Sequence, residues 1–177
     1  MRARLLKGGP GLAFVYDVPD NIRASDFSQT DHCINEGELY AAPLLLHSAP
    51  DALSGVDLIW WLDNRMACSS LVKGAAPAAE AARMSLFAHA SLAARGVSAF
   101  FDWVDSDANP ADPLSRLGFT DPFVSERLAS GAWVRFPVFD LPSFGSAPDF
   151  FQLIFSFFSA LGSGAPHSVG LPARSHE

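Results

Sequence analysis

Runs of apolar residues alternate with helix-forming segments along the middle of the chain. The segment VDLIWWLDN, residues 56–64, is almost continuously apolar and closes on an aspartate, which predicts a strand buried on both faces in a central sheet position. Residues 76–95 are rich in Ala, Glu, Arg, Met and Leu and stop at Gly96, which predicts a helix. VSAFFDWV, residues 97–104, predicts a second strand. Strand, helix and strand in this order indicate an α/β fold with parallel pairing.

The flanking segments extend this pattern less clearly. GLAFVYDV, residues 11–18, predicts a strand, and the following Pro-Asp-Asn predicts a turn, with a returning strand over IRASDF and the segment near HCI. Residues 36–47 have helical spacing, although Pro43 removes a backbone donor inside that helix. We therefore predict one α/β domain over 1–118. The remainder, 119–177, is predicted to be a Pro/Ser/Phe-rich extension that packs on the domain or is partly disordered.

Composition restricts the functions open to the chain. With 177 residues, 49% hydrophobic and 18% charged, it can bury a single core. The net charge of −7 and two lysines, Lys7 and Lys73, argue against binding nucleic acid through a broad basic surface. A nucleic-acid role must therefore depend on a local site, on metal ions that mask phosphate charge, or on neighbouring domains.

The two cysteines and the lengths of the apolar runs indicate where in the cell the protein is expected. Cys33 and Cys68 form no CxxC pair, so we expect neither a zinc site nor a disulfide framework. The apolar run over residues 150–162 is too short to span a bilayer, and the N-terminus lacks a cleavage pattern. We expect a cytoplasmic or nuclear protein with no membrane partner.

Three carboxylates stand at the predicted ends of elements. Glu38 lies in the first turn of a helix, Asp63 ends a strand, and Asp112 begins a helix after the last strand. Ligands of open α/β sheets gather at the carboxyl ends of parallel strands, so these acids can converge. Carboxylates that converge repel one another, and a hard divalent cation relieves that repulsion. Two magnesium ions at such a site would clamp a scissile phosphate.

The sequence segments around these acids resemble the ribonuclease H-like domain of retroelement reverse transcriptase polyproteins. The resemblance rests on INEGELYA (34–41), IWWLDNRMACSSLVKG (59–74) and FDWVDSDANPADPLSR (101–116), and it covers about residues 8–118. It implies a mixed sheet flanked by helices and hydrolysis of RNA in an RNA–DNA hybrid with Mg²⁺ or Mn²⁺. Other domains of a polyprotein are implied as further partners.

The same resemblance implies roles for individual residues. Glu38, Asp63 and Asp112 correspond to three of the family's four metal-binding, catalytic carboxylates. The neighbours that it implies for the site are Asn64, Asn109 and Ser115. Recognition would follow backbone shape and 2′-hydroxyl groups instead of base sequence.

The chain departs from the family pattern at its start. In the family the first carboxylate ends the first strand, which occupies the middle of the sheet, whereas GGPGLAFVYDV resembles the second strand. The first, central strand and its aspartate are therefore missing, and Asp17, at a predicted turn, is the substitute available. A missing central strand leaves unpaired backbone on both neighbours. Residues 1–8 replace it in part, another chain supplies it, or the sequence is a fragment.

Each residue also has a structural interpretation. Asp112 can interact with the dipole at a helix start, and Asp63 can simply close a strand. Glu36 is an alternative to Glu38 as the acid that the first turn of the helix contributes to the site. Arg65, Lys73 and Arg116 either contact a nucleic-acid backbone or form salt bridges. The aromatic residues of the strands are expected in the core, and Asp105 and Asp107 either assist proton transfer or are solvated.

These residues are compatible with four kinds of protein. The first is an active hydrolase, and the second is the same domain inactivated by loss of the first carboxylate. The others are a non-catalytic nucleic-acid-binding or structural module and a decayed fragment. The open strand edge and the Phe-rich tail also predict self-association.

Overall fold

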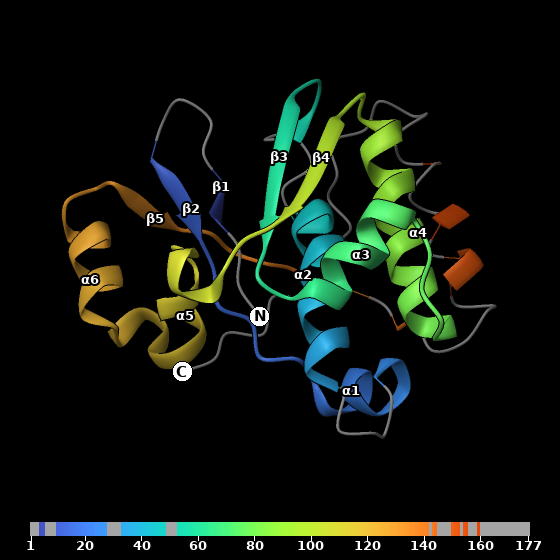
Figure 1. Cartoon of the computed structure of the whole chain (residues 1–177), viewed down its shortest axis with the longest axis horizontal. Helices are drawn as coiled ribbons and strands as arrows, with labels where there is room; N and C mark the ends of the chain where they lie inside the picture. The colour runs from blue at the N-terminus through green and yellow to red at the C-terminus, as the bar shows by residue number, and fades with distance from the viewer. Residues whose placement is uncertain are drawn as a thin grey trace.

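Two small β-sheets lie beside each other in this computed structural model, which describes residues 4–5, 10–27, 33–48, 53–141, 143–144, 150–152, 154–155 and 159 (Figure 1). The first sheet has the order β1 (Arg4–Leu5), β2 (Gly11–Ala13), β5 (Trp133–Arg135). In it, β1 is antiparallel and β5 parallel to β2. The second sheet pairs β3 (Asp57–Leu62) with β4 (Ser98–Trp103) in parallel. The fold is therefore mixed α/β.

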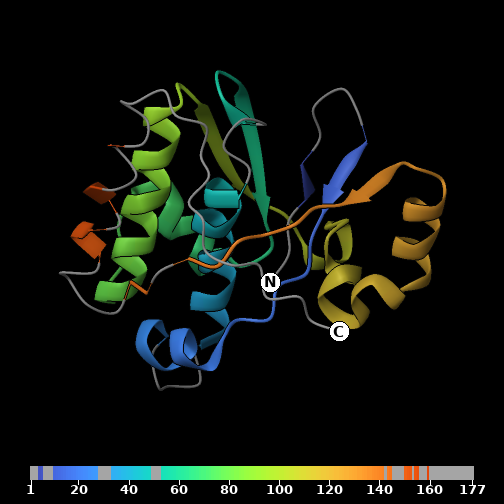
Figure 2. The same ribbon diagram turned by 180° about the vertical axis from the view of Figure 1, so that it is seen from behind.

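Three helices pack beside the β3–β4 sheet. They are α2 (Cys33–Ser48), α3 (Arg65–Lys73) and α4 (Ala79–Ala94), and α2 contacts both of the others. The short α1 (Asp20–Asp26) precedes them, and Figure 2 shows it at the same end of the molecule as the start of α2. Because α3 and α4 carry the chain from β3 back to the start of β4, the two strands run in the same direction.

The chain after β4 forms a second group of helices. Its members are the 3₁₀ turn η2 (Ser106–Ala108), α5 (Asp112–Leu117), η3 (Gly118–Thr120) and α6 (Pro122–Ala129). They lie beside β2 and β5, on the other side of the molecule from α4 (Figures 1 and 2). This group covers the β1–β2–β5 sheet and not the β3–β4 sheet.

The two groups of elements have separate apolar cores. The larger core lies between α2, α3, α4 and the β3–β4 sheet and includes the fully buried Leu39, Leu71, Met84 and Phe87. The smaller core joins Leu114 and Val124 to Trp133 and Ala13. Burial of this apolar surface is the main term that holds each group together.

Several predictions are confirmed. The expected helix over 36–47 lies within α2, where Pro43 stands inside the helix and is buried. The expected helix over 76–95 is α4, and Gly96 ends it with a positive φ of 62°, a conformation that glycine adopts without steric cost. The strands expected over 56–64 and 97–104 are β3 and β4.

Other predictions are wrong. The segment IRASDF lies in helix α1 up to Asp26 and not in a returning strand. Pro19, with a ψ of 145°, is the residue before the helix, and Asp20 places a favourable negative charge in the first helical turn. The strand expected over 11–18 is limited to β2. The expectation that β3 is buried on both faces also fails, since Ile59 and Trp61 are 61% and 53% exposed.

The sequence did not predict α3, α6 or β5. Of these, β5 lies beyond the boundary predicted after residue 118 and yet pairs with β2. Phe144 and Phe150, from the predicted extension, are buried, and Phe144 contacts Phe87 of α4. These parts of the extension therefore pack on the rest of the protein.

Within the described residues, we find no helix whose length and apolar character would allow it to cross a membrane.

Candidate functional site

The carboxyl ends of β3 and β4 lie together and define the candidate site. The backbone N–H of Val104 donates to the carbonyl of Leu62 at 2.9 Å, just where both strands end. One residue further, the indole Nε1 of Trp103 donates to the carbonyl of Asp63 at 3.1 Å. The position of Asp63 at the end of a parallel strand therefore agrees with its prediction.

Asn64 connects this end of the sheet to two helices. Its side-chain oxygen accepts the backbone N–H of Ala67 at 2.9 Å and caps α3. Its side-chain nitrogen donates to Asn35 Oδ1 on α2 at 2.8 Å. Asn64 is thus a neighbour of the site, as expected, but both ends of its amide are engaged in holding the fold.

Glu38 lies on α2, one turn after the residue that bonds to Asn64. It lies three residues after Asn35, so the two share a face of the helix, and the bond from Asn35 to Asn64 brings that face to the end of β3. Glu38 is partly buried. Its competitor Glu36 is only 4% exposed, so it belongs to the interior of the fold. Glu38 is consequently the acid of this helix that stands closer to solvent.

Asp112 has partners on its own helix. It stands at the start of α5, and its carboxylate accepts from Arg116 Nε at 2.8 Å and from Ser115 Oγ at 3.3 Å. Its side chain is 19% exposed, whereas that of Arg116 is 68% exposed. Asn109 accepts the N–H of Ala111 and so forms the turn before the helix. These contacts agree with the structural interpretation of Asp112 as a charged helix start.

The loop between β4 and α5 supplies two exposed acids. The carboxylate of Asp105 accepts the backbone N–H of Asp107 at 3.2 Å, which closes the short η2 turn. Both side chains are exposed to solvent. Together with Asp63 they make this end of the sheet acidic.

A cation lies on an aromatic ring at the same place, and sequence reasoning missed it. The guanidinium of Arg65 stands over the ring of Trp103, 4.1 Å from its centroid. Trp103 is only partly buried, although the strand pattern placed it in the core. The two residues are 38 positions apart in the sequence, so only the pairing of β3 with β4 brings them together.

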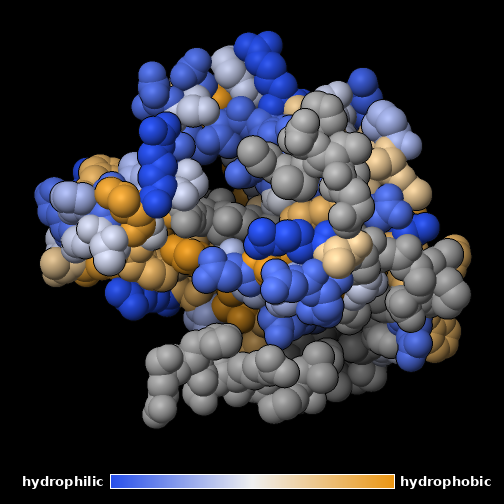
Figure 3. Space-filling model, turned by 90° about the horizontal axis from the view of Figure 1, so that it is seen from below, coloured by the Kyte–Doolittle hydropathy of each residue, from blue (hydrophilic) through white to orange (hydrophobic). Residues whose placement is uncertain are grey.

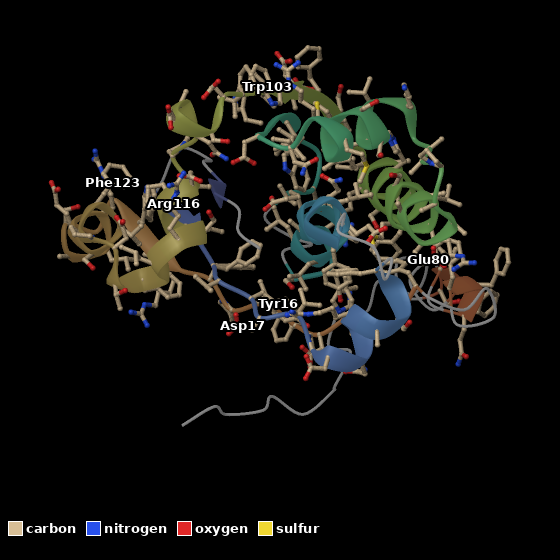
Figure 4. All side chains as sticks on the ribbon, turned by 60° about the horizontal axis from the view of Figure 1, so that its bottom comes forward. Tyr16, Asp17, Glu80, Trp103, Arg116 and Phe123 are labelled. Carbon is tan, nitrogen blue, oxygen red and sulfur yellow. The ribbon has the colours of Figure 1, made fainter. Side chains whose placement is uncertain are left out.

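Asp17, the proposed substitute for the missing acid, lies elsewhere. Figure 4 shows Trp103 and Asp17 on opposite sides of the centre of the view, and Trp103 contacts Asp63. Asp17 is exposed, and its neighbour Tyr16 donates to Asp140 at 2.9 Å. Asp17 therefore does not join the acids at the end of β3.

The resemblance implies a metal ion, and the arrangement of acids tests that implication. Among the described residues, which include Glu38, Asp63 and Asp112, no group of three or more His, Cys, Asp or Glu is placed to hold one. The carboxylate of Asp112 is already engaged by Arg116. In the part of the chain that the structure describes, Glu38, Asp63 and Asp112 are therefore not grouped as ligands of one metal ion.

The surface around the site is uneven. Viewed from below, the molecule is hollowed between the part at the left, where α5 and α6 lie in Figure 1, and the rest (Figure 3). Hydrophilic residues gather along the upper border of this face in the same view.

Comparison of the sequence with protein-family models and with curated proteins finds no match, and comparison of the fold with solved structures also finds none.

Proposed function

We propose that this chain is a ribonuclease H-like domain of retroelement origin that binds an RNA–DNA hybrid and, on its own, does not cut it. The proposal rests first on the three sequence segments that resemble this family, which occur in the same order and at similar spacing. Hydrolysis of the RNA strand is the activity that the resemblance implies.

The division of the strands into two sheets supports this assignment. In the family that the three segments resemble, a central strand joins the strands on its two sides into one sheet, and strands that it does not join would form two sheets. The chain has two sheets, β1–β2–β5 and β3–β4, and Figure 1 shows β1 and β3 as the strands of the two sheets that lie next to each other. An ordinary α/β sheet with all its strands would instead be continuous.

The proposal that the chain does not cleave the hybrid rests on the arrangement of the acids. Asn35, three residues before Glu38 on α2, bonds to Asn64 at the end of β3, but Asp112 is paired with Arg116 and no described group of three acids could hold a metal ion. Without a metal ion to stabilise the developing charge, phosphodiester hydrolysis in this family loses its main source of catalysis.

Arg65 is the residue that we propose contacts the hybrid. It is exposed at the end of the sheet, and stacking on Trp103 fixes the position of its guanidinium for a phosphate oxygen. The acids beside it oppose binding, because they repel phosphate groups. Binding is therefore expected to be weak and to follow the shape of the hybrid instead of its base sequence.

Binding and cleavage of a labelled RNA–DNA hybrid test the proposal. We expect binding by fluorescence anisotropy and no shortening of the RNA strand on gels, in either magnesium or manganese. Asp63→Asn removes one repulsive charge and should tighten binding. Cleavage by the intact chain that disappears in Asp63→Asn would instead establish a working metal-dependent hydrolase, and an absence of hybrid binding would refute the proposal.

A further inference from the structure

Three peptide groups of β3 point away from β4 and have no partner in the sheets of the described residues. The N–H of Ser98 donates to the carbonyl of Val56 at 3.2 Å, and the N–H of Val104 to that of Leu62 at 2.9 Å. In a parallel pair, every second residue directs its N–H and carbonyl groups to the partner strand. The two bonds show that on β3 these residues are Leu58, Trp60 and Leu62. The N–H and carbonyl groups of Asp57, Ile59 and Trp61 therefore point to the other edge, where no described residue pairs with them.

The outer edge of β4 differs from this edge. There the carboxylate of Asp102 accepts the backbone N–H of Trp103 at 2.8 Å, which occupies one of the edge donors. Of the two edges of this sheet, we take that of β3 as the one open to pairing, because a donor on the edge of β4 is already bonded.

Apolar side chains accompany the open edge. Ile59 and Trp61 of β3 are 61% and 53% exposed, and Phe100, which pairs with Ile59 in register, is 62% exposed. These three side chains lie on one face of the sheet. A strand added beside β3 would place its alternate residues next to Ile59 and Trp61 and bury part of this surface.

A second edge stands opposite. β1 is the end strand of its sheet, and Figures 1 and 2, drawn from opposite sides, both show β1 between β2 and β3. A strand that pairs with β3 on this side would therefore extend the β3–β4 sheet toward β1. A second copy of this chain, paired through its own β3, would bring its β4 to the position of β1.

We propose that an extended segment of another polypeptide, with apolar residues at alternate positions, adds as a strand along β3 on the side of β1. An extended backbone is the structure whose donors and acceptors repeat with the two-residue spacing of Asp57, Ile59 and Trp61. The inference depends on this edge and not on the nucleic-acid function, so each can fail without the other.

Amide hydrogen exchange of the full chain, followed residue by residue by NMR, tests the inference in the absence of nucleic acid. The probe is a short peptide in which threonine and valine alternate. Before its addition, the amides of Ile59 and Trp61 should exchange fast and those of Trp60 and Leu62 slowly. With the peptide, exchange at Ile59 and Trp61 should slow by about tenfold or more, while Trp60 and Leu62 change little.

Two controls separate strand addition from other binding. The same peptide with its alternate backbone nitrogens methylated cannot donate to the edge and should have no effect. In the protein, Ile59→Pro removes the outward N–H but no bond to β4 and should abolish the response, whereas Ile59→Thr should keep it.

Three outcomes would overturn the inference. They are unchanged exchange at Ile59 and Trp61 up to millimolar peptide, an equal response to the methylated peptide, and slow exchange of both amides before peptide is added. If that slow exchange depends on protein concentration, a second copy of the chain already occupies the edge.

Discussion

The side-chain nitrogen of Asn64 donates to Asn35 Oδ1 at 2.8 Å, and this bond fixes the start of α2 against the end of β3. The same amide caps α3 through its oxygen. One side chain therefore sets the relative positions of a strand and two helices, and through them the distance between Glu38 and Asp63.

Removal of the Asn64 amide should destabilise the protein more than removal of its partner. Asn64→Ala loses both the cap and the bond to α2, for which we expect about 2 kcal/mol less free energy of unfolding. Asn35→Ala loses only the bond, for which we expect about 1 kcal/mol. Urea denaturation of both variants measures the difference, and equal losses would show that the cap contributes nothing.

Substitution of Arg65 should weaken binding of the hybrid. Arg65→Ala removes the proposed phosphate contact, so affinity should fall for all sequences and the slope of log K against log salt should become shallower by about 1. The matched control is Arg127→Ala, because Arg127 also lies over an aromatic ring, that of Phe123, far from Trp103 in Figure 4. If the two variants bind alike, Arg65 is not a contact residue.

The pKa of Tyr16 should make the protein less stable in alkali. Burial, and then the hydrogen bond to Asp140, raise the pKa of this phenol above its ordinary value. Folding thus favours the protonated form, and this stabilisation is complete below about pH 10, where an unfolded tyrosine keeps its proton. As the pH rises beyond that value, the stabilisation is progressively lost.

Tyr16→Phe provides the measurement for this effect. The variant lacks the titrating group, so its denaturation midpoint should decline less between about pH 9 and 11 than that of the parent chain. The other tyrosine of the chain, Tyr40, remains in both proteins and serves as the internal control. Parallel declines would mean that Tyr16 does not contribute to the alkaline dependence.

The smaller core should be essential to the region that follows β4. Leu114 is fully buried with Val124 and Trp133, so Leu114→Ala should cost about 2–5 kcal/mol. Leu117 lies on the same helix but is 60% exposed, and Leu117→Ala should change stability by about 0.5 kcal/mol or less. Thermal unfolding followed by fluorescence compares the two, and similar shifts would argue against a distinct core here.

Elements with a strong local pattern were predictable from the sequence, and those that depend on distant partners were not. The apolar run of β3 and the Ala-rich composition of α4 each identify their own structure. By contrast, β5 has three residues and exists through its pairing with β2. The Pro-Asp-Asn segment at the start of α1 is equally suited to a turn and to a helix start, and the predicted turn is wrong.

The site shows the same limit. Chain order alone places Asp63 at a strand end and Asp112 at a helix start, and both positions are confirmed. The spacing of Asp112 and Arg116, four residues apart on a helix, could also have indicated their ion pair. Tertiary packing creates the bond between Asn35 and Asn64 and the stacking of Arg65 on Trp103. Neither contact could be predicted from a local sequence pattern.

The pairing of β2 with β5 joins residues 11–13 to residues 133–135, almost the whole described length apart. During synthesis on a ribosome, β2 emerges early and must wait with one side unpaired until its partner is translated. Closing so long a loop is entropically unfavourable and slow. Nascent chains of this protein should therefore need a chaperone, or a pause in elongation, late in translation.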